Sequence, residues 1–247
     1  MSRRAADQAI VDGRVRVNEQ HAALGQEISA TDTVQLDDAP LTPTEEKITV
    51  LLNKPVGYVC SRNGQGSKTI YELLPPELHN LKPVGRLDKD SSGVLLLTND
   101  GDLAHELTHP SKQKTKVYEV SLSKSLAPLH QQMITDYGIQ LEDGPSQFSI
   151  SKIDYPAHSA GASEQRAGEG GLPASEATSA PEERRASPQK ESKYQITMHE
   201  GRNRQIRRTF AALGYEVKSL HRTHFGNHAL GSLSSGKLIV VDQQPYV

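Results

Sequence analysis

Residues 85–101 read GRLDKDSSGVLLLTNDG. The apolar run at residues 94–98 is short, partly β-branched and closed by an Asn-Asp-Gly turn signal, so it predicts a buried strand. Arg86, Asp88 and Asp90 therefore belong to a glycine-bracketed loop at the mouth of that strand. A rigid strand that feeds a polar loop can hold one carboxylate still in a cleft.

The simpler interpretation of such a loop is a surface turn with solvated charges. The whole string, however, resembles the signature of the RNA pseudouridine synthases that modify bacterial ribosomal RNA, which is close to G-R-L-D-x-x-S-x-G-L-L-L-L-T-N-D-G. This resemblance implies that the chain converts uridine to pseudouridine in ribosomal RNA. It also implies that the aspartate of R-L-D, here Asp88, is the catalytic nucleophile or base.

The composition sets limits on the kind of protein. A chain of 247 residues can bury a core and carry one main domain with a smaller attachment. The net charge is -2, from 28 Lys and Arg against 30 Asp and Glu, so a surface that binds RNA must be local. The single cysteine, Cys60, excludes an internal disulfide and a multi-cysteine metal site. With no run long enough to span a bilayer, we expect a soluble, cytoplasmic monomer.

No metal or cofactor is predicted. His105 and His109 are four residues apart, but Pro110 ends their helix and no third ligand is spaced nearby. The isomerisation breaks an N-glycosidic bond and reattaches the same base through carbon, so it needs no external group. The expected partner is therefore ribosomal RNA alone.

Residues 1–38 predict a small basic α+β piece. Ser2 begins a helix that runs to about Val11, and an alternating strand follows. The strings Ser-Arg-Arg and Gly-Arg-Val-x-Val-Asn resemble the second half of an S4-type RNA-binding module, which implies that Arg3 and Arg4 contact RNA. The helix that precedes Ser-Arg-Arg in such modules is missing, so we expect a partial S4-like module.

Composition also places the other boundaries. Residues 39–46 read APLTPTEE and predict a linker, so the catalytic domain spans residues 47–247. Within that domain, residues 156–192 are dominated by Ala, Ser, Gly, Glu, Pro and Arg. Such a segment cannot bury enough apolar area to offset its chain entropy, so it predicts a disordered insertion.

A second informative stretch, residues 200–214, reads EGRNRQIRRTFAALG. Apolar residues recur at i, i+4 and i+7 from Ile206, which predicts an amphipathic helix. Arg204, Arg207 and Arg208 share its other face, where like charges repel unless that face meets a polyanion or a carboxylate. A basic, solvated helix is the alternative from charge alone.

This stretch resembles the G-R-x-x-Q-I/V-R-R motif of the same family. In that motif the arginine after Q-I pairs with the catalytic aspartate, so the resemblance gives that role to Arg207. We expect Arg207 opposite Asp88 to favour the ionised carboxylate against the desolvation of a buried site. The neighbouring Arg202, Arg204 and Arg208 are expected to contact phosphates.

Two further strings complete the resemblance. K-x-Y at residues 116–118 matches the base-stacking tyrosine, which implies that Tyr118 stacks on a flipped-out uridine; from alternation alone it would be a core tyrosine. The closing L-x-R-x-x-x-G pattern implies that Leu220 lines the active site. The remaining candidates for RNA binding are Arg86, Lys116 and Arg222.

The predicted fold class is α+β: a mixed, mainly antiparallel sheet with flanking helices and a central RNA-binding cleft. A non-catalytic S4-type RNA-binding protein that acts in ribosome assembly is the alternative, but it does not explain Asp88 with a matching arginine and tyrosine. A metal-dependent hydrolase would need Asp88, Asp90 and Asp100 to converge on a cation. A strand of about ten extended residues separates Asp100 from Asp88 by roughly 30 Å, which argues against it.

Overall fold

The computed structural model describes residues 1–41, 46–153 and 192–241. The chain divides into two compact units, Met1–Glu46 and Lys47–Val247. Most of the predicted insertion lies outside the described residues, and its last residue, Ser192, already belongs to a strand.

The first unit is one helix with a small sheet. Ser2 begins the helix, because its hydroxyl accepts a hydrogen bond of 3.2 Å from the main-chain N–H of Ala5. The strands are ordered β2-β1-β3-β4, and β4 occupies residues that the sequence placed in the linker. The elements are α1 (Arg3–Val11), β1 (Val15–Val17), β2 (Gln20–His21), β3 (Val34–Leu36) and β4 (Ala39–Pro40).

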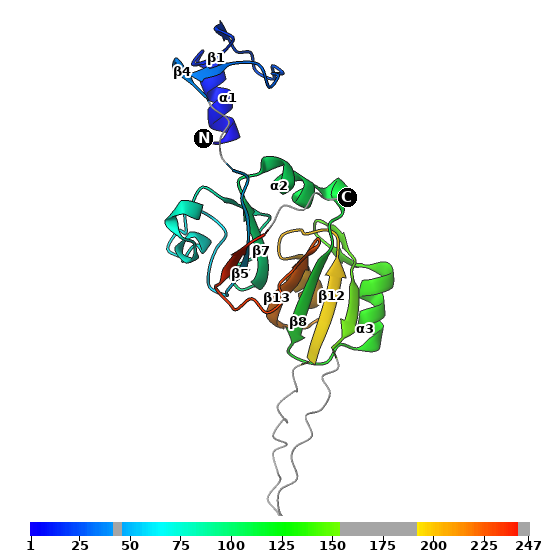
Figure 1. The fold of residues 1–247 in the computed structure, drawn as a ribbon. Helices are drawn as coiled ribbons and strands as arrows, with labels where there is room; N and C mark the ends of the chain where they lie inside the picture. The colour runs from blue at the N-terminus through cyan, green and yellow to red at the C-terminus, as the bar shows by residue number, and fades with distance from the viewer. Residues whose placement is uncertain (42–45, 154–191, 242–247) are drawn as a thin grey trace, which may run out of the picture. The chain divides into compact units, whose positions relative to one another are not determined.

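The second unit is built on one large sheet (Figure 1). Its strand order is β11-β12-β8-β13-β7-β5-β15, with β6 beside β7 and β14 beside β13. Every pairing among these strands is antiparallel except that of β13 with β7, so the predicted mixed, mainly antiparallel sheet is confirmed. The strands are β5 (Thr49–Lys54), β6 (Lys82–Val84), β7 (Ser92–Thr98), β8 (Lys116–Leu122), β11 (Ser149–Lys152), β12 (Ser192–Met198), β13 (Val217–Phe225), β14 (His228–Ala229) and β15 (Leu238–Val240).

Short helices flank the sheet, and β9 and β10 form a separate hairpin. The helix after β7 is capped by Asp100, because the Asp100 carboxylate accepts from the N–H groups of Asp102 and Leu103. The remaining elements are α2 (Gly101–Thr108), α3 (Pro128–Gln132) with its π-turn (Met133–Tyr137), α4 (Gln205–Ala212), β9 (Ile139–Leu141), β10 (Gly144–Ser146) and 3-10 turns at Ile70–Leu73, Pro76–Leu78 and Pro110–Lys112.

The last glycine of the GRLDKDSSG loop joins the two halves of this sheet. The parallel pairing of β7 with β13 consists of Ser92 beside His221 and Gly93 beside Arg222. Gly93 has φ +105°, and a Cβ there would lie 2.1 Å from the main-chain oxygen of Arg222. Only glycine allows so close an approach with this backbone. The loop that carries Asp88 is thereby fixed to the strand that carries Leu220.

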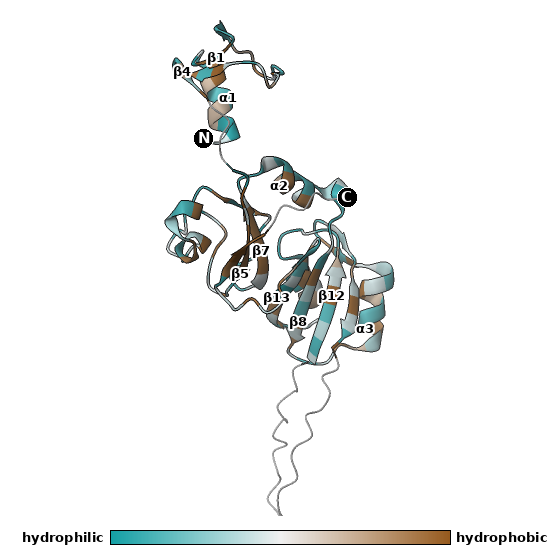
Figure 2. Cartoon of the chain, in the orientation of Figure 1, coloured by the Kyte–Doolittle hydropathy of each residue, from teal (hydrophilic) through white to brown (hydrophobic). Residues whose placement is uncertain are grey.

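The core explains why these elements stay together. The strands β5 and β7 are buried along almost their whole length and are brown in Figure 2. The helix α4 buries Ile206 and Phe210, and the ring of Phe210 meets that of Tyr215 edge to face at 6.4 Å. Full burial of one such side chain contributes about 1.5–3 kcal/mol. This packing fixes the end of α4 that carries the arginines.

Candidate active site

Lys54, at the end of β5, holds the loop that carries Asp88. Its side chain is fully buried, with 0 % exposure, and its Nζ donates to the main-chain oxygens of Pro55, Asp88 and Ser91 at 3.1, 3.0 and 2.8 Å. Burial lowers the pKa of Lys54, and the nearby carboxylates, including Asp88, oppose that shift. The ammonium group therefore holds the backbone of the loop at two points, Asp88 and Ser91.

Cys60 adds a second support at Leu87. Its Sγ lies 3.4 Å from the main-chain nitrogen of Leu87 and 3.3 Å from its main-chain oxygen. Burial raises the pKa of this thiol, which suits a neutral group that both donates and accepts. Together, Cys60 and Lys54 hold the backbone of Leu87 and Asp88 in place.

The arginines of α4 converge on Asp90. Arg204 donates two hydrogen bonds to the Asp90 carboxylate, of 3.0 and 2.9 Å, and its Nη1 lies 3.7 Å from Oδ2 of Asp88. The Nε of Arg207 lies 3.3 Å from Oδ2 of Asp90, within ion-pair distance but without hydrogen-bond geometry. The hydrogen bonds from Arg204, followed by the charge of Arg207, hold the pKa of Asp90 below its usual range.

This geometry differs from the expected pair of Arg207 with Asp88. Among the described residues, the ion pair of Arg207 is with Asp90, and the arginine in ion-pair distance of Asp88 is Arg204. The reason is the position of Arg204, which is not on the helix face but at the N-cap, with φ +47°. With this left-handed backbone, the guanidinium of Arg204 lies within ion-pair distance of both Asp88 and Asp90.

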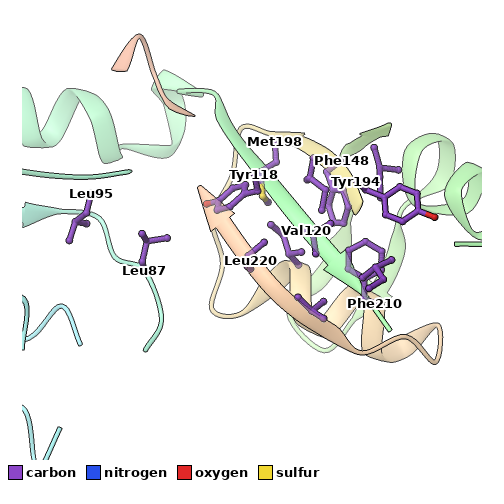
Figure 3. Close-up of a cluster of buried hydrophobic side chains, with 14 of the residues drawn as sticks. Leu87, Leu95, Tyr118, Val120, Phe148, Tyr194, Met198, Phe210 and Leu220 are labelled. Atoms are coloured by element: carbon purple, nitrogen blue, oxygen red, sulfur yellow. The ribbon is translucent and has the colours of Figure 1, made fainter. Parts of the chain in front are cut away.

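A cleft of about 1090 Å³ lies beside Asp88, whose side chain is 34 % exposed. Tyr118 on β8 and Leu220 on β13 line this cleft and are each 7 % exposed. Tyr118 and Val120 are two residues apart and therefore point to the same face of β8. Leu220 pairs with Val120, so all three side chains lie on one face of the sheet (Figure 3). The predicted Asp88, Tyr118 and Leu220 therefore meet in one cleft.

Two of the predicted RNA-binding residues lie in the wall of the cleft, where Arg222 is buried and Lys116 is partly buried. Arg222 is 3 % exposed, its Nε donates to the main-chain oxygen of Val94 at 2.8 Å, and its guanidinium lies 4.8 Å from the ring centroid of Phe225. Lys116 donates to the main-chain oxygens of Lys114 and His199, and burial lowers its pKa. Arg222 thus supports the sheet. Its charge is not at the surface, where the predicted contact with RNA would place it.

Arg202 and Arg208 share a partner that the sequence analysis did not identify. Both bind the carboxylate of Asp143 in the β9–β10 turn, at 3.0 Å from Arg202 and at 3.0 and 2.6 Å from Arg208. Arg202 also donates to main-chain oxygens of that turn. Their first role is therefore to fasten the hairpin to α4, although both side chains keep partial exposure.

The remaining predicted RNA contacts are at the surface. Arg86 is exposed at the rim of the cleft. Arg3 and Arg4 are exposed in the first turn of α1, in the other unit. Within residues 1–41, 46–153 and 192–241, no three His, Cys, Asp or Glu residues are grouped so that they could hold a metal ion.

The family model of the RNA pseudouridylate synthases matches residues 48–212. The chain belongs to this family. It is therefore an isomerase that converts uridine to pseudouridine in RNA, which confirms the enzymatic interpretation over a non-catalytic RNA-binding protein.

Relatives of this synthase extend over both units. An RNA pseudouridine synthase of Aquifex aeolicus is 34% identical, over 96% of this chain and 83% of its own length. The ribosomal large subunit pseudouridine synthase B of Bacillus subtilis is 31% identical, over 95% of this chain and 84% of its own. A crystal structure of a pseudouridylate synthase matches with a TM-score of 0.63 and 28% identity, over 98% of this chain and 91% of that one.

Sequence reasoning missed three residues of the synthase site. Lys54 lies in an Asn-Lys-Pro string, and a lysine at the end of a buried strand was the available signal. Asp90 was visible beside Asp88, but no motif linked it to the arginines. Asp143 carried only a turn signal.

None of the helices in the described ranges combines the length and apolar character that a membrane span requires.

Proposed function

We propose that this synthase isomerises a uridine in ribosomal RNA, with Asp88 as the catalytic nucleophile or base. The observation that carries the proposal is the position of Asp88: its backbone is held by Lys54, and its carboxylate lies at the cleft that Tyr118 lines. The substrate class rests on relatives that are named ribosomal large subunit pseudouridine synthases, in Bacillus subtilis and Pseudomonas aeruginosa.

The chemistry requires an ionised carboxylate at neutral pH. The reaction breaks the bond from the base nitrogen to the ribose and forms a bond from a base carbon to the same ribose carbon, so the substrate supplies every atom of the product. Arg204 lies 3.7 Å from the Asp88 carboxylate, and the ammonium of Lys54 binds the main-chain oxygen of Asp88 from behind the loop, so two cations surround the reacting group.

The cleft suits a nucleotide that has left its helix. A uridine within helical RNA is inaccessible to a side chain, so it must be flipped out to reach Asp88. Ligand pockets hold about 300–1,000 Å³, and the cleft has about 1090 Å³. Tyr118 would stack on the base and Leu220 would support it from the neighbouring strand.

Exposed cations would bind the phosphates around the target. Arg86 at the rim, and the partly exposed Arg204 and Arg208, supply charge beside the cleft. In the N-terminal unit, Arg3 and Arg4 would contact RNA in the manner of a partial S4-type module. Because the net charge of the chain is -2, binding to RNA must rely on local cations such as these.

The test is carbodiimide labelling of ribosomal RNA after incubation with the full chain and no added cofactor. The wild type should give a new reverse-transcription stop in a large-subunit transcript, and Asp88→Asn should give none while its RNA affinity stays within about twofold. Asp102→Asn, an exposed aspartate on α2, is the matched control. Substantial turnover by Asp88→Asn would refute the catalytic role, and modification of neither ribosomal RNA would refute the substrate class.

A further inference from the structure

Asp90 takes the hydrogen bonds that a catalytic carboxylate would otherwise receive. Both terminal nitrogens of Arg204 bind its two oxygens, at 3.0 and 2.9 Å. Arg207 lies 3.3 Å from the same carboxylate and donates to the main-chain oxygen of Asp90 at 2.8 Å. Within the described part of the chain, the cation in ion-pair distance of the Asp88 carboxylate is Arg204, and their 3.7 Å separation is too long for a hydrogen bond.

This division matters because a carboxylate reacts through its lone pairs. A bidentate arginine occupies both oxygens with strong, charge-assisted hydrogen bonds, so a carboxylate held in that way is stable and poorly available. An arginine nitrogen at 3.7 Å makes no such hydrogen bond. Both oxygens of Asp88 therefore stay accessible from the cleft, with the charge of Arg204 close by.

The surroundings hold Asp90 in this position independently of its own side chain. Lys54 binds the main-chain oxygens of Asp88 and Ser91, on either side of Asp90. The side chain of Arg207 is 13 % exposed, and its Nη1 donates to the main-chain oxygen of Val217 on β13. Removing the Asp90 carboxylate should therefore leave the loop and Arg207 in place.

We propose that Asp90 is a positioning residue of the isomerisation: its carboxylate retains Arg204 and thereby keeps both oxygens of Asp88 available to the substrate. The proposal rests on the catalytic role of Asp88 given above. Without the charge of Asp90, Arg204 has one carboxylate left within reach, and it closes on Asp88. The catalytic group is then occupied by an arginine in the free enzyme and in the complex with RNA.

The decisive experiment measures turnover at saturating RNA for Asp90→Asn, Arg204→Gln and the double variant. Asp90→Asn should lower kcat about 10- to 100-fold with KM within about threefold, because it affects the reacting group and not RNA binding. Adding Arg204→Gln removes the arginine that closes on Asp88, so the double variant should recover at least about tenfold in kcat over Asp90→Asn. A general distortion of the loop would not be relieved in this way.

Two further variants serve as controls. Asp102→Asn removes an exposed carboxylate of α2 that does not line the cleft, and it should leave kcat within about twofold. Asp90→Glu keeps the charge and should retain kcat within about fivefold. The Asp90 side chain is 44 % exposed, so these isosteric or conservative changes do not endanger folding, which melting temperatures will check.

Each result decides the proposal. A kcat for Asp90→Asn within threefold of wild type would overturn it, as would a double variant as slow as Asp90→Asn, or a loss in Asp90→Glu as large as in Asp90→Asn. Failure of the underlying assignment would look different, since Asp88→Asn would then remain active whatever the Asp90 variants do.

Discussion

The ammonium group of Lys54, a residue with 0 % exposure, lies 3.0 Å from the main-chain oxygen of Asp88. A buried charged group must find partners, and Lys54 finds the carbonyl oxygens of Asp88 and Ser91 in the loop and that of its neighbour Pro55. The rigidity of the loop thus depends on a residue that is more than thirty positions away in the sequence.

Lys54→Met should lower the free energy of unfolding by about 2–4 kcal/mol, because it leaves the carbonyl oxygens of Pro55, Asp88 and Ser91 without this donor. Methionine keeps most of the aliphatic volume, so the loss reports the hydrogen bonds and not a cavity. Urea unfolding measures it, with Lys82→Met, an exposed position on β6, as the control. A loss no larger than that of the control would show that Lys54 does not hold the loop.

Gly93→Ala should lower the free energy of unfolding far more than Gly57→Ala. Both glycines have positive φ, +105° and +95°, but a Cβ at Gly93 would meet main-chain atoms of Arg222, whereas one at Gly57 meets nothing within 4 Å. Backbone strain alone should cost about 1–2 kcal/mol at Gly57. At Gly93 the clash with β13 adds to that strain, for a total of about 3 kcal/mol or more. Equal losses in melting temperature would contradict the close approach of β7 and β13.

Asp100→Ala should lower the free energy of unfolding by about 1–2 kcal/mol at pH 7, because it removes the N-cap of α2. Asp100→Asn should lose less, since asparagine also caps helices and the ion pair with the exposed Lys47 contributes less than about 1 kcal/mol.

The pH dependence of Asp100 has a definite sign. The hydrogen bond from Lys47, and then the N–H groups of the helix, hold the pKa of Asp100 below its usual range. The stabilisation that ionised Asp100 contributes is therefore fully present above its unfolded pKa of about 3.9. It is lost as the pH falls through the lower pKa of the native state. The stability difference between wild type and Asp100→Asn should shrink between pH 7 and strongly acid solution. A constant difference would exclude Asp100 as the titrating group.

Replacing residues 154–191 by a four-residue turn should preserve the fold. The strands on either side are already paired, with Lys152 opposite Tyr194 and the N–H of Ile153 donating to the main-chain oxygen of Lys193 at 3.0 Å. For the disordered insertion that the sequence predicts, each halving of the connection stabilises by about 0.6 kcal/mol, so the shorter chain should gain up to about 2 kcal/mol. A large fall in melting temperature would show that these residues contribute to the core.

Local pattern in the sequence determined the elements that carry the site. The apolar run after the Asp88 loop predicted β7, alternation predicted β8, and helical spacing from Ile206 predicted α4, because these periodicities reflect which side of an element faces the core. The strings around Asp88 and Arg207 also indicated the family.

Only the tertiary structure decided how the charges are paired. Residue spacing placed Arg204 and Arg207 on one helix face and could not show that Arg204 lies at the N-cap, bound to Asp90 and nearest to Asp88. It likewise could not show that Lys54 is buried. Ion pairs are set by distances of a few ångströms between elements, and those distances follow from how α4 packs on the sheet and how closely Gly93 lets β7 approach β13. No local pattern along the chain encodes them.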